Sequence, residues 1–494
     1  MPDSVRCDQH QDRAETPAMP RGVATVRADL TGLSRWLTLA IGSLLLSGLL
    51  ALLLVIGRAP GLSALVQDPG FFRRCLVVHV DLSLLVWLYA FIAGLLSLLA
   101  EQRSVGRLAR SGPYVAAGGV LLMLVGAGVR GARPVVANYV PVIDHWSFLL
   151  GLLVLVIGIV LGVVDRRLLP ATHVRLADPP VPAAAVVGLR ATLVALLLAV
   201  LTFAMSFIHL PPGLTADVRY EIVFWGGGHV LQLASTCAMV SVWLMLLGQL
   251  TGKAPIRREV AAVCFGVLVV PWGVAPLLPA YGLQHVAARE AFTHLMRWGI
   301  FPPVLVLLVL CIRHLIVTGP PRAALRDPRF TGFVASAALT VLGYVLGALI
   351  RGSTTMIPAH YHAAIGAVTV AFMAASYWLL GALGFKADHR PLTRRLVGLQ
   401  PALFGAGQAV FALGFAIAGV HGAGRKLYGP EQPPELLRSI GLAVMAAGGV
   451  VAISAGLLYL GLVARARLGR RWSPAAVAPL PVTSPGGIHG SVRT

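Results

Sequence analysis

Long apolar stretches recur along this chain, separated by short polar segments. A helix that crosses a hydrocarbon core of about 30 Å needs about 20 predominantly apolar residues. Stretches of about that length occur at residues 33–57, 75–100, 113–130, 143–165, 185–208, 220–248, 257–279, 291–316, 330–350, 357–383, 398–420 and 437–463. The pattern therefore predicts an all-α integral membrane protein of about twelve transmembrane helices, forming one domain over residues 33–463.

Both ends of the chain lack this pattern. Residues 1–32 are largely polar and carry no apolar core before a small-residue cleavage site, so they do not have the form of a signal peptide. Residues 464–494 are rich in Pro, Ser and Gly. Each end is predicted to be a disordered cytoplasmic tail.

The composition is typical of a membrane protein, and the placement of the basic residues accounts for the high net charge. Hydrophobic residues make up 57% of the chain and charged residues only 12%, whereas charged residues make up about a quarter of a soluble domain. The net charge of +21 comes from basic residues that gather in alternate loops, as membrane topology signals do. These include Arg103, Arg107, Arg110, Arg166, Arg167, Arg175, Lys253, Arg257, Arg258, Arg322, Arg326, Lys386, Arg390, Arg394 and Arg395. We therefore expect lipid as the surroundings, no nucleic-acid partner, and a bacterial-type cytoplasmic membrane with both termini on the cytoplasmic side.

Histidines fall near the outer ends of four predicted spans. A single histidine near a helix end is more often a hydrogen-bonded interfacial residue than a ligand. Ionisable groups inside a membrane are costly, however, and tend to be functional, and imidazole is a common ligand of heme iron, copper and non-heme iron. A shared layer in four spans therefore favours a buried metal centre. Its members are His79, His229, His294, His360 and His362, with His285 in the loop before His294 as a weaker candidate.

Two of these histidines are separated by one residue. His360 and His362 lie in Ile-Pro-Ala-His-Tyr-His, at the start of an apolar run. Each residue of an α-helix turns the chain by about 100°, so positions i and i+2 point roughly 200° apart. One helix would thus serve two centres. In another span, residues 226–228 are three glycines directly before His229, a run that allows either a flat ring or a neighbouring helix to approach the backbone.

These residues together resemble subunit I of the heme-copper oxidase superfamily, which includes terminal oxidases and nitric oxide reductases, over nearly the whole chain. The resemblance implies a twelve-helix bundle and two hemes. His79 and His362 would hold a low-spin heme, and His360 would hold the high-spin heme at which oxygen or nitric oxide is reduced.

The resemblance also implies a third metal, copper or non-heme iron, facing the high-spin heme. His229, in Phe-Trp-Gly-Gly-Gly-His, stands at the position of one of its ligands. His294 is a candidate further ligand from the eighth span. Arg425 and Lys426, in the loop before the last span, stand where the family pairs basic residues with heme propionates.

The chain departs from the family pattern at several positions. The adjacent histidines expected at the outer end of the seventh span are absent, since residues 271–278 contain no histidine. Leu233 stands where one class of oxidases has a tyrosine, and the span that carries His229 has no glutamate after it, unlike nitric oxide reductases. The inner halves of the spans contain almost no Asp, Glu or Lys, so proton pumping is not predicted.

The leading functional hypothesis is a membrane oxidoreductase that moves electrons from a low-spin to a high-spin heme and reduces oxygen or nitric oxide. The five cysteines form no C-x-x-C-H motif for a covalent heme. Electrons would therefore come from a partner subunit, a soluble cytochrome or a quinol. A heme-based gas sensor or an electron conduit with a degenerate metal site is the second hypothesis. A twelve-helix secondary transporter is the third, although the motifs show none of the internal repetition expected of one.

Overall fold

The structure is a computed structural model. It describes residues 25–27, 29–59, 62, 68–100, 105–163, 173–175, 181–385, 390–425 and 435–468. Within these ranges, twelve helical segments are long and apolar enough to cross a membrane. The prediction of an all-α bundle with about twelve spans is confirmed. The predicted tails fall mostly outside the described residues, and the first and last helices begin at Leu30 and end at Leu468.

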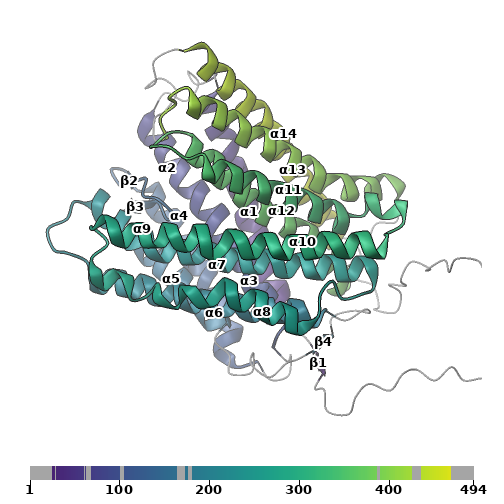
Figure 1. Cartoon of the computed structure of the whole chain (residues 1–494). Coiled ribbons are helices and arrows are strands. Elements are labelled where there is room, and N and C mark those ends of the chain that lie inside the picture. The colour runs from purple at the N-terminus through teal and green to yellow at the C-terminus, as the bar shows by residue number, and fades with distance from the viewer. Residues whose placement is uncertain are drawn as a thin grey trace, which may run out of the picture.

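Nine spans are single helices and three are built from consecutive helical pieces. The single helices are α1 (Leu30–Arg58), α4 (Arg107–Gly128), α5 (Trp146–Val163), α6 (Ala183–Ile208), α7 (Ala216–Thr251), α11 (Pro328–Ala348), α12 (Met356–Ala382), α13 (Pro391–Val420) and α14 (Leu436–Leu468). The composite spans are α2 (Pro69–Val80) with α3 (Trp87–Ser97), α8 (Arg258–Val269) with short 3₁₀ turns up to Tyr281, and α9 (Val286–His294) with α10 (Phe301–Thr318). The helices run side by side through one bundle (Figure 1).

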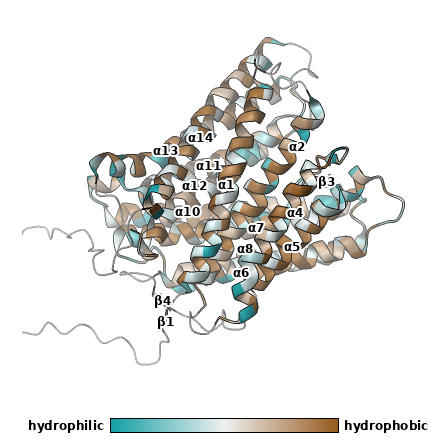
Figure 2. Cartoon of the chain, turned by 180° about the vertical axis from the view of Figure 1, so that it is seen from behind, coloured by the Kyte–Doolittle hydropathy of each residue, from teal (hydrophilic) through white to brown (hydrophobic). Residues whose placement is uncertain are grey.

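Three spans form the centre of the bundle. In the most apolar window of α7, 83% of the residues are buried, and the corresponding shares are 78% for α12 and 61% for the span that joins α2 to α3. In the other spans, a smaller share of the corresponding window is buried. The ribbons of the outer helices carry much brown, the colour of hydrophobic residues (Figure 2). Such faces are expected where lipid replaces water. The histidines of the predicted site lie on these three central spans, apart from His294.

Small residues let neighbouring helices approach closely. A Cβ built on Gly119 of α4 would lie 2.4 Å from the backbone nitrogen of Leu155 in α5, and one built on Gly414 of α13 would lie 2.2 Å from that of Met445 in α14. Membrane helices associate through close van der Waals packing of this kind, because lipid offers no hydrophobic driving force between them. These contacts hold the outer helices to each other around the central spans.

Two short strand pairs lie at opposite ends of the bundle (Figure 1). The strands β1 (Thr25–Arg27) and β4 (His173–Arg175) pair in parallel at one end. At the other end, β2 (Arg133–Val135) and β3 (Val142–Asp144) form an antiparallel hairpin between α4 and α5. This hairpin covers the end of the bundle at which the histidines lie.

Candidate functional site

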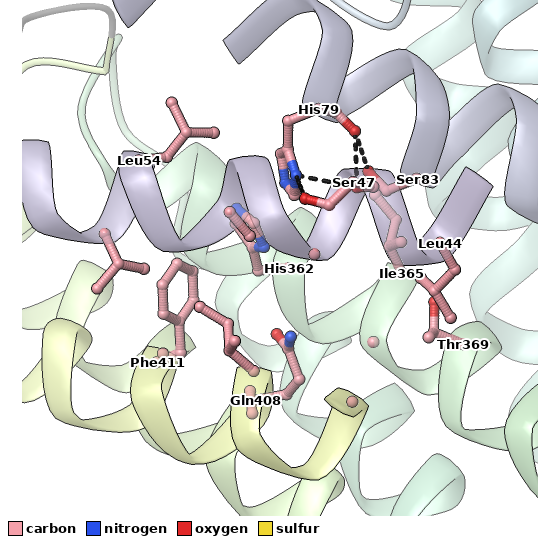
Figure 3. A pocket seen from close by; sticks show the side chains of 18 of the residues that line it. Leu44, Ser47, Leu54, His79, Ser83, His362, Ile365, Thr369, Gln408 and Phe411 are labelled. Atoms are coloured by element: carbon pink, nitrogen blue, oxygen red, sulfur yellow. Dashed lines mark hydrogen bonds between the residues drawn. The ribbon is translucent and has the colours of Figure 1, made fainter. Parts of the chain in front are cut away.

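His79 and His362 line the same cavity, of about 190 Å³, between α1, the second span, α12, α13 and α14. His79 lies in the last turn of α2 and His362 near the start of α12. Figure 3 shows the two imidazole rings facing the same space. The fold thus brings together two residues that lie 283 positions apart in the chain.

The ring of His79 is held by the first helix. Its Nδ1 lies 2.9 Å from the backbone carbonyl oxygen of Ser47 and 3.0 Å from the Ser47 hydroxyl, which itself donates to the carbonyl of His79. A carbonyl only accepts, so Nδ1 carries the proton and donates. The free Nε2 is then the ligating atom, in the arrangement by which metal-bound histidines are oriented. A π-helical turn follows directly over Asp81–Val86, a distortion found often at functional sites.

Aromatic rings and one cation complete this first cavity. The ring of His362 packs 4.7 Å from Phe411 and 5.8 Å from Phe415, centre to centre. The guanidinium of Arg58 lies 5.6 Å from the Phe415 ring, and its buried Nε has no hydrogen-bond partner among the described residues. Flat apolar walls, two imidazoles and a guanidinium with an unpartnered buried nitrogen suit a heme with anionic propionates. The residues present therefore fit a heme held by His79 and His362.

A second cavity, of about 540 Å³, adjoins the first and contains His360 and His229. His360 and His362 thus line different cavities, as their spacing on one helix predicts. The Nδ1 of His360 lies 2.7 Å from the carbonyl oxygen of Gly343 in α11, which leaves Nε2 free. A Cβ on Gly347 would come within 2.7 Å of that ring nitrogen, so a glycine is needed for the ring to lie there. This site fits one further heme.

His229 occupies the wall of this second cavity, and both of its ring nitrogens have partners. Nδ1 lies 2.7 Å from the carbonyl oxygen of Trp225, and Nε2 lies 2.7 Å from the hydroxyl of Tyr139. Tyr139 was not predicted from the sequence. It lies in the turn of the β2–β3 hairpin, where no periodic pattern marked it. Burial raises the pKa of the Tyr139 hydroxyl above its usual range, against the lowering effect of Arg425 and with a further raising effect of Glu221, so the hydroxyl stays protonated.

The three glycines before His229 accommodate aromatic rings from three different elements. A Cβ on Gly226 would lie 2.8 Å from the ring of Phe292, one on Gly227 would lie 2.3 Å from the ring of Phe203, and one on Gly228 would lie 2.4 Å from the Cβ of Tyr139. Phe292 belongs to α9 and Phe203 to α6, so the glycines allow neighbouring helices to pack closely, one of the two interpretations left open by the sequence.

The other candidate ligands lie elsewhere. His294, at the end of α9, and His285, at its beginning, are exposed and do not line the second cavity. Nowhere in the described part of the chain do three or more His, Cys, Asp or Glu side chains gather as a metal site would require. The donor set around His229 therefore does not fit the third metal, and the structure gives His294 no place in it.

Of the two basic candidates in the loop before α14, Arg425 lies within the described residues. Arg425 lines the second cavity, donates to the side-chain oxygen of Asn138 and lies 5.8 Å from the centre of the Tyr361 ring. Asn138 in turn donates to Glu221 from its backbone and its side chain. Lys426 lies outside the described residues.

Asp81 follows His79 by two residues and is completely buried. Neither of its carboxyl oxygens has a hydrogen-bond partner among the described residues, and it lines neither of the two cavities. Asp81 therefore lies in the packed interior of the bundle and not at its surface.

Comparisons with known proteins agree with this arrangement. Residues 33–452 match the sequence model of the family described as cytochrome c and quinol oxidase polypeptide I. An uncharacterized protein of Rickettsia prowazekii (strain Madrid E) is 24% identical, with 86% of this chain and 94% of that protein aligned. An uncharacterized protein of Aquifex aeolicus (strain VF5) is 28% identical over 71% of this chain and 85% of its own length.

Among solved structures, the chain resembles a heme-copper terminal oxidase studied as a dimer by cryo-electron microscopy. The TM-score is 0.67, with 91% of this chain and 86% of that chain covered. The sequence identity is 16%, so this likeness concerns the fold alone.

Proposed function

The chain belongs to the cytochrome c and quinol oxidase polypeptide I family, and we propose that it is a membrane oxidoreductase subunit that carries a low-spin and a high-spin heme and reduces oxygen or nitric oxide. The resemblance recognised in the sequence is thus confirmed at the level of the family. The observation that carries the proposal is the pair of adjoining cavities, one lined by His79 and His362 and the other by His360.

In this proposal, three histidines of the chain supply the heme ligands. His79 and His362 would hold the low-spin heme through their ring nitrogens, and His360 would hold the high-spin heme. When bound, the two hemes supply electron transfer and an iron that binds the gas. Tyr361 lies between the two helix α12 histidines and lines both cavities, as do Arg58 and Ile365. One layer of side chains therefore separates the two positions, which favours rapid electron transfer.

Cations near the cavities support anionic groups at both positions. Arg58 lines both cavities, and Arg425 lines the second. Guanidinium groups bind carboxylates through charge-assisted hydrogen bonds. We assign them to heme propionates, with Lys426 as a further candidate. The electron donor would be a partner subunit, a cytochrome or a quinol, and the protein would lie in a bacterial-type cytoplasmic membrane with both termini in the cytoplasm.

Optical spectroscopy tests this function directly. The purified protein is expected to give a reduced-minus-oxidised spectrum of two hemes, one of which binds carbon monoxide. His362→Ala is expected to abolish the low-spin signal, while His360→Ala keeps it and loses carbon monoxide binding. His314→Ala is a matched control, because this buried membrane histidine bonds to Thr251 and lines neither cavity. Absence of heme from folded wild-type protein, or equal loss of both signals in both variants, would contradict the proposal.

A second function is favoured by the donor set around His229. No group of three metal-binding side chains surrounds it in the described residues, so the second candidate is a heme-based gas sensor or an electron conduit. Consumption of oxygen or nitric oxide by the purified protein with an artificial electron donor separates the two. Binding of the gas without consumption would support the sensor.

A further inference from the structure

Tyr139 and His229 form a hydrogen-bonded pair on the wall of the cavity that His360 lines. We infer that this pair takes the place of the third metal, the one expected to face the high-spin heme. The cavity then binds a diatomic ligand at the heme iron alone, and the Tyr139 hydroxyl is a polar group that faces the ligand. The inference rests on the proposed function for the heme. Beyond that function, it states which groups surround the bound ligand and names Tyr139 as the residue that sets their polarity.

The two nitrogens of His229 are both used within the protein. The Trp225 carbonyl only accepts, so Nδ1 carries the proton and Nε2 is the lone-pair nitrogen. Nε2 is the atom that would bind a metal, and it accepts the Tyr139 hydroxyl hydrogen at 2.7 Å. A metal on His229 would have to displace Tyr139. It would then find too few further ligands, because the described residues contain no group of three or more His, Cys, Asp or Glu side chains.

The backbone around Tyr139 is built for this position. Tyr139 has a φ of 64°, the only positive φ of a non-glycine residue in the described chain, and the amide of Val140 donates to the carbonyl of Asn138 across it. This is a γ-turn in its rare, strained form. Strained residues persist where the surroundings hold them, and they cluster at ligand sites. Asn138, directly before it, is held by Glu221 and Arg425.

The side chain of Tyr139 is fixed as firmly as its backbone. Its ring meets Trp225 edge to face, with the centres 5.8 Å apart at 89°. Gly228 leaves the space that the Tyr139 Cβ and ring fill. The hydroxyl donates its only hydrogen to His229 and keeps a lone pair toward its surroundings. Tyr139 and His229 line the cavity together with His360, so a ligand bound there meets an oriented phenol oxygen.

Metal analysis and vibrational spectroscopy of the carbon monoxide complex test the inference. The wild-type protein is expected to contain two irons per chain and no third metal, and His229→Ala is expected to leave that content unchanged. The carbon monoxide stretching frequency is expected to shift in Tyr139→Phe. Tyr220→Phe is the matched control, because it also removes a hydroxyl that forms a hydrogen bond of 2.7 Å, here to Asp144, but lies outside the cavity. The carbon monoxide stretching frequency of this variant should stay at the wild-type value.

The possible failures are distinguishable. A third metal in stoichiometric amount overturns the inference, whether or not His229→Ala removes it. A Tyr139→Phe variant that retains both hemes and binds carbon monoxide, but shows the wild-type stretching frequency, also overturns the inference. Absence of a heme that binds carbon monoxide from folded wild-type protein would instead overturn the proposed function on which the inference rests.

Discussion

At the scale of single residues, Gly228 controls whether Tyr139 can reach His229. A Cβ at position 228 would lie 2.4 Å from the Cβ of Tyr139 and 2.5 Å from its Cγ, closer than atoms can pack. The ring of Tyr139 is fixed against Trp225 and cannot swing aside without losing that contact. An alanine at position 228 must therefore push the hairpin turn away from α7.

We predict that Gly228→Ala reproduces the spectral effect of Tyr139→Phe and lowers the free energy of unfolding by about 1–3 kcal/mol, the usual cost of overpacking. Gly266→Ala in α8 is the control, because nothing lies within 4 Å of a Cβ built there. It should stabilise the helix by about 0.5–1 kcal/mol. Thermal unfolding in detergent and the carbon monoxide spectrum measure both effects. A Gly228→Ala protein with wild-type values of both would contradict the close packing described here.

The residues of the site differ in how far the sequence could reveal them. The placement of His360 and His362 in different cavities followed from helical geometry alone. His79 and His229 were identified because histidine is rare at membrane depth and costly there. Tyr139 was missed because a positive φ in a turn leaves no periodic mark. His294 was a candidate by its depth in the membrane, but depth does not say which side of a helix faces inward, and His294 is exposed and lies outside the second cavity.

At the scale of elements, the β2–β3 hairpin connects the site to α7 and to the loop before α14. Its turn, residues 136–141, holds Tyr139 over the cavity. Asn138 joins this turn to Glu221 at the start of α7 and to Arg425 in the loop before α14. The position of Tyr139 therefore depends on the contacts of the residue next to it as well as on its own.

Asn138→Ala is predicted to loosen this turn. The side chain makes hydrogen bonds to two charged groups, and each such bond contributes about 1.5–3 kcal/mol. Hydrogen exchange of the amides in residues 136–141 should accelerate, with the helices protected as in the wild type. Arg133→Ala on the same hairpin is the control, since its ion pair with Asp217 is exposed and such pairs contribute about 0–1 kcal/mol. Equal exchange in both variants would show that Asn138 does not hold the turn.

At the scale of the whole molecule, the twelve spans could be predicted because span length and hydropathy are local properties of the chain. The cavities could not, since each arises where segments far apart in the sequence meet. The first lies between α1, the second span, α12, α13 and α14, and the second between the second span, α7, α12 and the turn of the β2–β3 hairpin. The alternate loops do gather as the charge pattern requires. The amide of Arg425 bonds to Ser353 between α11 and α12, and β1 near the N-terminus pairs with β4 between α5 and α6.

The orientation of this bundle in the membrane is the remaining prediction at this scale. Basic residues favour the cytoplasmic side, and they are concentrated in the loops at the end opposite to the histidines. Arg351, between α11 and α12, is therefore expected outside and Arg322, between α10 and α11, inside; both are exposed. In intact cells, a membrane-impermeant maleimide should label Arg351→Cys, whereas Arg322→Cys should react only after permeabilisation. Cys75, Cys237 and Cys311 are buried, and the parent protein measures any background from Cys7 and Cys264. The reverse labelling pattern would place the two cavities near the cytoplasmic face, and both termini and the side from which the proposed electron donor approaches would then be reversed.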